Sequence, residues 1–407
     1  MGRLHAGVAE PMTMAGMQLD ELQTEILRTV RDFVDREVIP IADEMEHRDE
    51  YPEKIVEQMK QMGLFGVTIP EEFGGLGQPL TLYALIVSEL SRGWMSLSGI
   101  MNTHFMTGYL IRKHGTEEQK QRYLPRLATG EVRAALSMSE PGAGSDVAAI
   151  TCRAIKDGDH YVVDGQKMWV TNGMRAGIVT LLCKTDPSAD PPHRGISILL
   201  VEKEADEENP APGLIVGKNI PKLGYKGVET TELVFEGHRV PTTQLLGTEE
   251  GKGFTQIMDG IEVGRVNVAA RAVGVSTRAF EEAIKYAQIR NTMGKPIAQH
   301  QAIQFKLAEM ATKLEASRLM LLNAARKKDL GERSDLEAGM AKLFASEMCM
   351  EICLDALRIH GGYGYSAEYT VERLYRDAPF LLIGEGTSEI QKLVIARGLL
   401  ERFKVES

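Results

Sequence analysis

The stretch Met138-Ser-Glu-Pro-Gly-Ala-Gly-Ser-Asp146 marks the point where the pattern of this 407-residue chain changes character. Residues before it recur at helical spacing, whereas the residues after it form short runs rich in Val, Thr and Ile, which is typical of strands. Its glycines and proline allow an unusual backbone path, so the loop can present N–H groups to a ligand oxygen or phosphate. The spacing Gly-x-Gly-x-x-Val outside a βαβ unit is not a dinucleotide fingerprint, and a plain surface turn is the alternative.

The composition is that of an ordinary soluble globular protein, with 43% hydrophobic and 26% charged residues. The net charge of −10 argues against a generic nucleic-acid binder and against a protein of anionic membranes. Every apolar run is interrupted before about 18 residues, so no transmembrane helix is expected. Four cysteines are few for this length and favour a reducing compartment such as the cytoplasm. Cys349 and Cys353 share a predicted helix face without further ligands at metal spacing, so core packing is expected there and no metal site is predicted.

The residues before the loop predict an N-terminal all-α domain over 18–133. Apolar residues recur at three- and four-residue steps over 19–38, and Pro40 is expected to end this helix. Thr116-Glu-Glu-Gln119 has the pattern of a capping box that opens a later helix. Residues 1–17 lack the continuous apolar segment of a signal peptide, so they are interpreted as a mobile leader.

The residues after the loop predict a small β domain and then a helical bundle. Over 134–247, strand-like runs alternate with turn dipeptides such as Asp157-Gly158 and Asp164-Gly165, which predicts a small all-β domain. Over 248–404 the helical period returns, and long helices separated by short Gly or Pro breaks predict an antiparallel bundle. The predicted fold class is therefore α+β and mainly α, with C-terminal helices expected at 254–290, 298–329, 334–360 and 388–403.

Three further segments combine glycine with polar or aromatic groups. Lys167-Met-Trp-Val-Thr-Asn-Gly173 contains one of the two tryptophans, and a core Trp before a hairpin turn is one interpretation. Arg290-Asn-Thr-Met-Gly-Lys-Pro-Ile297 separates two predicted helices, and Arg290 either binds a diphosphate or complements a helix C-terminus. His360-Gly-Gly-Tyr-Gly364 is either a helix C-cap or a place where a ligand approaches the backbone closely.

The last segment of interest is Ile383-Gly-Glu-Gly-Thr-Ser-Glu-Ile390. Glu385 lies between two glycines, after an apolar run and before a helix start at which Thr387 or Ser388 is the expected cap. A carboxylate in apolar surroundings has a raised pKa, which suits a general base. A solvated loop glutamate is the alternative, and the spacing alone does not decide between the two.

Taken together, and in this order, these segments resemble the acyl-CoA dehydrogenase family of flavoenzymes over nearly the whole chain. The most specific matches are Ser139–Asp146 and Glu385–Gln391, with Arg290-x-x-x-Gly-Lys295 between them. The resemblance implies an N-terminal helical domain, a barrel-like middle β domain and a C-terminal four-helix bundle, usually assembled as a homotetramer. It also implies FAD as cofactor and an acyl-CoA thioester as substrate, oxidised to the trans-2-enoyl-CoA.

The same resemblance assigns the catalytic base. Glu385 matches the glutamate that removes the α-proton while the β-hydrogen leaves as hydride to the flavin. Some relatives place this carboxylate on an earlier helix, at a position that corresponds here to Gly264, which cannot act as a base. Glu262 is the nearest rival, and it is expected to project from a different side of that helix. The backbone N–H of Glu385 is expected to bind the thioester carbonyl, as in an oxyanion hole.

Cofactor and substrate contacts follow residue by residue from the resemblance. The substrate side is expected to include Ser145, Arg265, Gly384 and Gly386, and Gln301 is expected to reach FAD across a subunit interface. The expected FAD contacts are Met138, Ser139, Ser145, Trp169, Thr171, Arg290, Gln301, Arg358, Gly361, Gly362, Thr387 and Glu389.

Two positions depart from the family pattern. Many relatives have Gln at the position of Arg358, which puts that FAD contact in question, and many have Tyr at the position of Gly384. Loss of a ring at 384 is expected to widen the pocket, which favours a short branched or substituted acyl group, such as isovaleryl or a substituted succinyl. Lys226 and Arg265 are the side chains considered for a second substrate carboxylate.

The resemblance also bears on partners and alternatives. An electron-transfer flavoprotein is the expected electron acceptor, whereas an oxidase of the same architecture would pass electrons to oxygen. A non-catalytic DNA-binding relative is a third possibility, and the net charge of −10 argues against it. Neither nucleic-acid binding nor membrane binding is expected.

Overall fold

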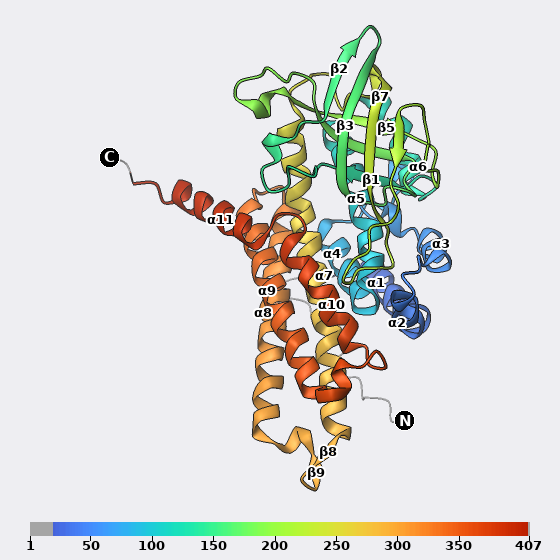
Figure 1. The fold of residues 1–407 in the computed structure, drawn as a ribbon. Helices are drawn as coiled ribbons and strands as arrows, with labels where there is room; N and C mark the ends of the chain where they lie inside the picture. The colour runs from blue at the N-terminus through green and yellow to red at the C-terminus, as the bar shows by residue number, and fades with distance from the viewer. Residues whose placement is uncertain (1–18, 406–407) are drawn as a thin grey trace.

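The computed structural model describes residues 19–405, so the predicted leader at 1–17 lies outside the described residues. The N-terminal part is helical, as predicted, and includes a buried pair of helices, α4 and α5 (Figure 1). Its elements are α1 (Glu21–Phe33), a π-helical turn (Val34–Val38), α2 (Ile39–His47), α3 (Glu53–Gln61), α4 (Leu80–Gly93), α5 (Met95–His114) and α6 (Glu117–Ala128).

Pro40 does not end the first helix, contrary to the prediction. The π-helical turn joins α1 to α2, and Pro40 falls within the first turn of α2. Backbone N–H groups in the first turn of a helix have no acceptor within that helix, so proline is tolerated there. The capping box at Thr116 is confirmed, because its side chain accepts from the Gln119 N–H while the Gln119 side chain accepts from the Thr116 N–H.

A seven-stranded sheet follows, in the order β1-β4-β2-β3-β7-β6 with β5 paired to β4. The β1–β4 and β2–β4 pairs are parallel and the others are antiparallel. One face of the sheet covers a core of its own, separate from the main helical core. The strands are β1 (Ala134–Ser137), β2 (Arg153–Asp157), β3 (His160–Thr171), β4 (Ile178–Lys184), β5 (Ile196–Glu202), β6 (Leu214–Val216) and β7 (Thr230–Pro241).

The two predicted turn dipeptides have different outcomes. Asp157-Gly158 makes the predicted turn between β2 and β3, with Gly158 at φ 62°. Asp164-Gly165 instead lies inside β3, where the register against β7 shifts. A Cβ at Gly165 would lie 2.7 Å from the Cys152 Cα, so glycine is required there by close packing of the backbone and not by a turn.

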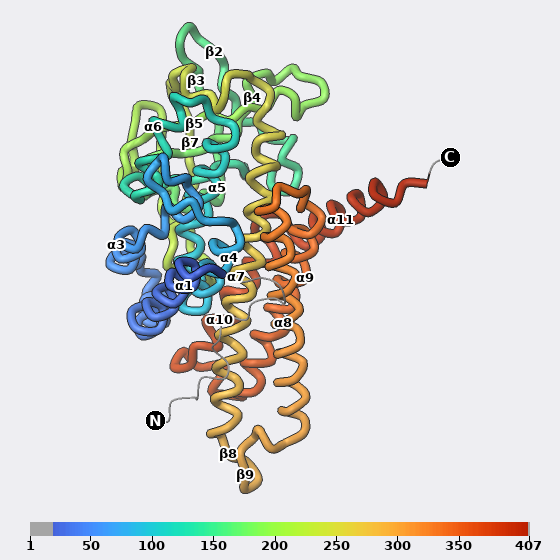
Figure 2. Tube along the Cα trace, turned by 180° about the vertical axis from the view of Figure 1, so that it is seen from behind, coloured from blue at the N-terminus to red at the C-terminus, as the bar shows by residue number. Residues whose placement is uncertain are grey.

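The C-terminal part is a bundle of four helices with a fifth that projects from it (Figures 1 and 2). The bundle helices are α7 (Gly253–Ile289), α8 (Gln301–Asp329), α9 (Asp335–His360) and α10 (Val371–Ile383), and α11 (Ser388–Arg402) projects. A two-stranded ladder, β8 (Asn291–Thr292) with β9 (Lys295–Pro296), joins α7 to α8. The predicted fold class is confirmed. The sequence analysis did not predict α10, which contains Pro379.

The remaining single turns of 3-10 helix are Leu64–Gly66, Glu71–Phe73, Val147–Ala149, Pro192–Gly195, Thr242–Gln244, Ile297–Gln299 and Gly361–Tyr365. Among the described residues, no helix is long and apolar enough to cross a membrane. Cys349 and Cys353 are buried in the main core, with their sulfur atoms 4.0 Å apart. Helix α5 packs against both α7 and β1, and this contact brings the three parts of the chain together around one junction.

Candidate active site

Glu385 lies at this junction, in the loop between α10 and α11. Its backbone is left-handed, with φ 55°, and Gly386 follows at φ 87°. Left-handed backbone is costly for a non-glycine residue, so the surrounding structure must hold it. The Lys342 Nζ donates to the Gly386 carbonyl at 2.7 Å, and the Gln391 Nε2 donates to the Glu385 carbonyl at 3.0 Å. Both anchoring side chains are fully buried, so the loop is fixed from beneath.

The Glu385 carboxylate reaches from this loop to helices α5 and α7. Its Oε1 accepts a hydrogen bond from the Asn102 Nδ2 of α5 at 3.0 Å. A Cβ added at Gly264 of α7 would lie 2.8 Å from the Glu385 Oε2 and 3.2 Å from the Met106 sulfur. The carboxylate therefore packs on bare helix backbone, and a side chain at 264 would displace it.

Glu262 points elsewhere, as expected. Its two carboxylate oxygens bind the Lys328 Nζ and the Ser334 hydroxyl, each at 2.7 Å. Both partners lie on the α8–α9 side of the bundle. Glu262 is thus occupied in an ion pair and is not directed at the junction where Glu385 lies.

Burial raises the pKa of Glu385, and this is the largest influence on it. The positive charge of Arg271, the hydrogen bond from Asn102 and the charges of Arg265 and Lys342 oppose the rise. The carboxylate is therefore more basic than an exposed glutamate while these four groups still favour its ionised form. This balance suits a general base.

Three buried polar atoms on residues around Glu385 have no hydrogen-bond partner among the described residues. They are the Oδ1 of Asn102, the Oε1 of Gln391 and the Nε of Arg265, the neighbour of Gly264. Arg265 is 8% exposed, and burial lowers the pKa of its guanidinium. Buried polar atoms usually have partners, so the unpaired atoms of Asn102 and Arg265 mark a place where a ligand would complete the site.

Sequence reasoning missed Arg271, which lies seven residues after Gly264 on the same face of α7. Arg271 is 1% exposed, its Nε donates to the Asn267 Oδ1 at 2.7 Å, and its NH1 donates to the Tyr225 hydroxyl at 3.1 Å. The available signal was a pair of polar residues four apart, Asn267 and Arg271, inside the otherwise apolar run 266–275. Lys226, one of the two side chains considered in the sequence for a second substrate carboxylate, lies next to Tyr225 in the same loop. Its backbone N–H donates to the Glu46 carboxylate.

Gly384 does not open space in the way that the sequence predicted. A Cβ at this position would lie 2.7 Å from the edge of the Phe380 ring. Phe380 stacks on Tyr225 with ring centroids 4.6 Å apart. A ring from another position of α10 therefore fills the volume next to Gly384, and the expectation of a wider pocket from this glycine alone is wrong.

The loop after β1 lies beside the end of β3, which fits a flat cofactor ring. The Met168 N–H donates to the Ser139 carbonyl at 2.9 Å, and the buried Lys167 Nζ donates to the Met138 carbonyl and the Glu140 carboxylate. Trp169 has φ 62° and is 57% exposed, so it is not the core tryptophan of the alternative interpretation. A large exposed ring at a bulge is available for stacking.

Met138, Ser139 and Trp169 belong to a first group of predicted cofactor residues, which also includes Ser145, Thr171, Thr387 and Glu389. Gly142 and Gly144 have no atom within 4 Å of an added Cβ, so the loop backbone is accessible to a ligand. Ser145 and Glu389 are exposed, whereas Thr171 is partly buried at the end of β3. The Thr387 hydroxyl caps α11 by accepting from the Ile390 N–H at 3.3 Å. An exposed aromatic ring beside a glycine-rich loop is a set of groups that fits the ring and phosphates of FAD.

A second group of predicted cofactor residues lies far from the first within one chain. Helix α7 has 37 residues, and the 26 residues from Gly264 to Arg290 span about 39 Å. Arg290 is exposed over the Tyr363 ring, 5.6 Å from its centroid. The rest of this group consists of exposed residues near the same end of the bundle, namely Gln301, Arg358, Gly361 and Gly362. The structure of one chain does not bring the two groups together.

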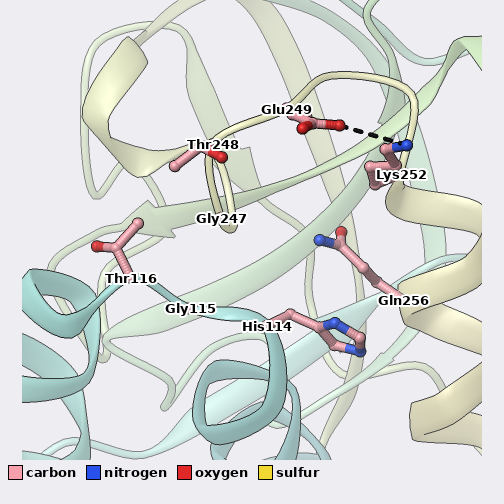
Figure 3. Close-up of a pocket in the computed structure, with 8 residues that line it drawn as sticks. All are labelled: His114, Gly115, Thr116, Gly247, Thr248, Glu249, Lys252 and Gln256. Atoms are coloured by element: carbon pink, nitrogen blue, oxygen red, sulfur yellow. Dashed lines mark ion pairs between the residues drawn. The ribbon is translucent and has the colours of Figure 1, made fainter.

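A separate surface pocket of about 340 Å³ lies between the end of α5 and the start of α7 (Figure 3). Charged and polar side chains line it, including Glu249 and Lys252, whose charged atoms are 3.3 Å apart. None of the predicted site residues lines this pocket. The site described above therefore rests on Glu385 and its neighbours and not on this surface hollow.

Comparison with known proteins identifies the class of this fold and site. Three family models match in order: the N-terminal domain of acyl-CoA dehydrogenase at 20–131, the middle domain at 135–238 and the C-terminal domain at 251–400. The chain belongs to the acyl-CoA dehydrogenase family. It is a flavin-dependent oxidoreductase of that family, whose members are FAD-dependent flavoproteins that act on acyl-CoA.

Individual relatives match along their length. The chain is 42% identical to the 3-(aryl)acrylate reductase of Clostridium sporogenes, over 93% of this chain and 99% of that protein. It is 41% identical to the (2S)-methylsuccinyl-CoA dehydrogenase of Cereibacter sphaeroides, over 96% of this chain and 71% of that protein. The butyryl-CoA dehydrogenase structure from Megasphaera elsdenii superposes with a TM-score of 0.88 at 34% identity, over 94% of this chain and 99% of that chain.

Proposed function

We propose that this chain catalyses α,β-dehydrogenation of a short branched or substituted acyl-CoA thioester, with Glu385 as the base that removes the α-proton. The observation that carries the proposal is the Glu385 carboxylate, fixed over the bare backbone of Gly264 and hydrogen-bonded to Asn102. Bound FAD supplies the acceptor for the β-hydride. Burial raises the pKa of Glu385, which makes it a stronger base toward a weakly acidic C–H.

The chain also supplies groups that orient the thioester. The left-handed backbone of Glu385 is held by Lys342 and Gln391, so its N–H has a fixed direction and can donate to the thioester carbonyl as negative charge develops there. Gly384 and Gly386 flank Glu385 and are proposed to contact the substrate through their backbone. Arg265, with its unpaired buried Nε, and the exposed Ser145 complete the proposed substrate side.

The proposed FAD contacts come from both groups described above. Met138, Ser139, Trp169 and Thr171 would hold the flavin ring, with Ser145, Thr387 and Glu389 at its margin. The second group would hold the diphosphate and adenosine end, through Arg290, Gln301, Arg358, Gly361 and Gly362.

We propose that the assembled enzyme is a homotetramer in which FAD is held between subunits. The separation of about 39 Å along α7 between Gly264, which packs against Glu385, and Arg290 is what supports shared sites. Large apolar side chains are also exposed along the same C-terminal helices, as expected for surfaces that are covered by another subunit. They include Phe305, Leu319, Leu393, Leu400 and Phe403.

The proposed electron acceptor is an electron-transfer flavoprotein, and an oxidase reaction with oxygen is the alternative. Oxygen consumption during turnover distinguishes the two. The four cysteines are all free and buried, which agrees with the proposed cytoplasmic location. One relative is named as a dehydrogenase of a methyl-substituted succinyl-CoA, which supports a substituted acyl group here. Another is named as a reductase, so the direction of the reaction also needs a test.

The test is an anaerobic titration of the FAD-loaded protein with butyryl-, isobutyryl-, isovaleryl-, 2-methylsuccinyl-, glutaryl- and octanoyl-CoA. We expect a short branched or substituted member to bleach the oxidised-flavin absorbance most rapidly. A highest kcat/KM for octanoyl-CoA would contradict the substrate proposal. Absence of bleaching by every thioester would contradict the proposed reaction itself, and reduction of the matching enoyl-CoA by the pre-reduced protein would show a preference for the reverse direction.

A further inference from the structure

We propose that the acyl group of the substrate carries a second carboxylate and that Arg271 binds it. This inference rests on the proposed function, because it places the carboxylate beside the carbon atoms on which Glu385 acts. The ligand class is a dicarboxylic acyl group of four or five carbons, attached to CoA through one end. Arg271 would then be the residue that determines specificity for the free end.

Arg271 is a buried cation without a carboxylate at ion-pair distance. It is 1% exposed, it forms no ion pair among the described residues, and the nearby carboxylate on which its charge acts is that of Glu385. Its hydrogen bonds go to neutral groups, the Asn267 Oδ1 and the Tyr225 hydroxyl. A buried charge is costly unless it is paired and hydrogen-bonded, so a ligand carboxylate bound directly to Arg271 would stabilise this cation.

The chain also holds the groups around this guanidinium in fixed positions. The Asn267 Nδ2 donates to the Tyr83 hydroxyl at 2.8 Å, which leaves the Asn267 oxygen directed at Arg271. Tyr225 enters from the β domain with a left-handed backbone at φ 58°. A Cβ at Gly99 would lie 1.7 Å from the Tyr225 hydroxyl, so α5 requires glycine at that position to admit the phenol.

The two buried acids near the Tyr225 loop bind its backbone instead of the arginine. Asp377 accepts from the Tyr225 N–H at 2.6 Å, and Glu46 accepts from the Lys226 N–H at 2.9 Å. Glu46 also accepts from the Trp94 indole at 2.7 Å. These acids fix the loop that delivers Tyr225, and neither of them neutralises Arg271.

Arg271 lies on the same helix as Gly264, against which the Glu385 carboxylate packs. Gly264, Asn267 and Arg271 follow one face of α7, because they are three and four residues apart. A helical side chain leans toward the N-terminus, and the bond from Arg271 to Asn267 shows this direction. Asn267 lies about 4.5 Å along the helix axis from Gly264, and the Glu385 carboxylate packs against Gly264. A chain of four or five carbons covers that separation.

Two aromatic rings lie beside this guanidinium. The stacked rings of Tyr225 and Phe380 have their centroids 5.5 and 5.7 Å from its central carbon. The N–H groups of the planar guanidinium fork are the donors that a carboxylate would meet.

A different role for Arg271 is to serve only as a distant counter-charge that keeps Glu385 ionised. In that case its removal would slow all substrates equally. In the proposed role its removal would slow only substrates with a free carboxylate. The two roles therefore differ in the ratio between paired substrates and not in activity alone.

The experiment measures kcat/KM of the FAD-loaded enzyme for two matched pairs. Methylsuccinyl-CoA is paired with 2-methylbutyryl-CoA, and succinyl-CoA with butyryl-CoA, so that only the terminal carboxylate differs within a pair. We expect the wild type to favour the carboxylated member of at least one pair by at least about 100-fold. Arg271→Met is expected to bring that ratio to within about tenfold, mainly by slowing the carboxylated member.

Controls separate the possible failures. Arg278→Met removes another half-buried arginine of α7, which pairs with Glu282 at 3.1 Å, and it is expected to leave the ratio unchanged. Arg271→Lys, which keeps the charge but loses the planar fork, is expected to give an intermediate ratio. It replaces Arg271→Met in the experiment if that variant does not fold.

Two outcomes would overturn the inference while leaving the proposed function intact. One is that the wild type turns over the uncharged member of each pair as fast as the carboxylated member, or faster. The other is that Arg271→Met lowers kcat/KM by the same factor for both members of a pair. If none of the four thioesters nor any other acyl-CoA bleached the flavin, the proposed function would itself have failed.

Discussion

At the scale of single residues, the site depends on a relation between Glu385 and Gly264. The Glu385 carboxylate occupies the volume that any side chain at position 264 would need. A second carboxylate at 264 would also place two like charges together, which raises the pKa of one of them. The helix position and the loop position are therefore mutually exclusive places for the base, and this chain uses the loop.

Glu385→Gln is expected to retain FAD and ligand binding and to lose at least about 1,000-fold in kcat, because the amide cannot accept the α-proton. The measurement is the rate of flavin bleaching after rapid mixing with the best substrate. Glu262→Gln is the matched control, since Glu262 binds Lys328 and Ser334, and it is expected to keep the rate within about tenfold. Survival of most activity in Glu385→Gln would place the base elsewhere.

The pH dependence of the same step follows from the raised pKa. The base must be ionised, so kcat/KM is expected to fall as the pH drops through the folded-state pKa of Glu385, which lies above that of an exposed glutamate.

At the scale of elements, α5 links the site to the stability of the N-terminal domain. Asn102 faces Glu385, whereas His104, two residues later, is 1% exposed and binds the Leu127 carbonyl of α6 through its Nε2 at 3.0 Å. Burial lowers the pKa of His104 to about 4. One helix thus carries a catalytic contact on one side and a neutral histidine in the core on the other.

This histidine predicts a loss of stability in mild acid. The unfolded chain takes up a proton near pH 6.5, whereas the folded chain resists it down to about pH 4, so stability falls as the pH drops below 6.5. The contribution of His104 is about 2 kcal/mol by pH 5. Thermal unfolding at pH 7 and pH 5 is the measurement. Between pH 7 and pH 5, the unfolding temperature of His104→Gln is expected to fall less than that of the wild type. The unfolding temperature of His160→Gln, in the β2–β3 hairpin, is expected to fall as much as that of the wild type. An identical drop in wild type and His104→Gln would contradict this assignment.

At the scale of the whole molecule, Arg290 and its group of cofactor residues lie about 39 Å along α7 from Gly264, which packs against Glu385. A single chain therefore offers two half-sites, and subunit assembly would complete them. The projecting helix α11 and the exposed apolar residues of α8 provide surfaces for such contacts (Figure 1). Cofactor affinity and oligomeric state are expected to be coupled for this reason.

Arg290→Ala tests this coupling from the half-site that is remote from Glu385. Loss of a charge-assisted bond to a diphosphate is expected to weaken FAD binding by about 10- to 100-fold. The measurements are the flavin retained after gel filtration and the mass of the species in solution, with and without added FAD. Arg36→Ala, an exposed arginine of the N-terminal domain, is the control and is expected to retain FAD. Full retention of FAD by Arg290→Ala, or a monomer that binds FAD tightly, would argue against shared sites.

The sequence by itself determined the order of helical, β and helical parts, because periodicity and turn residues are local properties. It also determined the family and the loop that carries Glu385. It failed at Pro40 and Asp164-Gly165, where one residue type has two uses: proline ends a helix or enters its first turn, and glycine makes a turn or allows close packing. It also missed α10, whose internal proline interrupts the usual pattern.

Only the tertiary structure decided which side chains meet. Phe380 fills the space beside Gly384, Tyr225 crosses from the β domain to Arg271, and Gly264 lies beneath Glu385 although 121 positions separate them in the chain. The burial of Arg271, its lack of an ion pair among the described residues and the raised pKa of Glu385 are properties of groups brought together from distant segments. No local pattern encodes them, because they depend on which surfaces the folded chain removes from water.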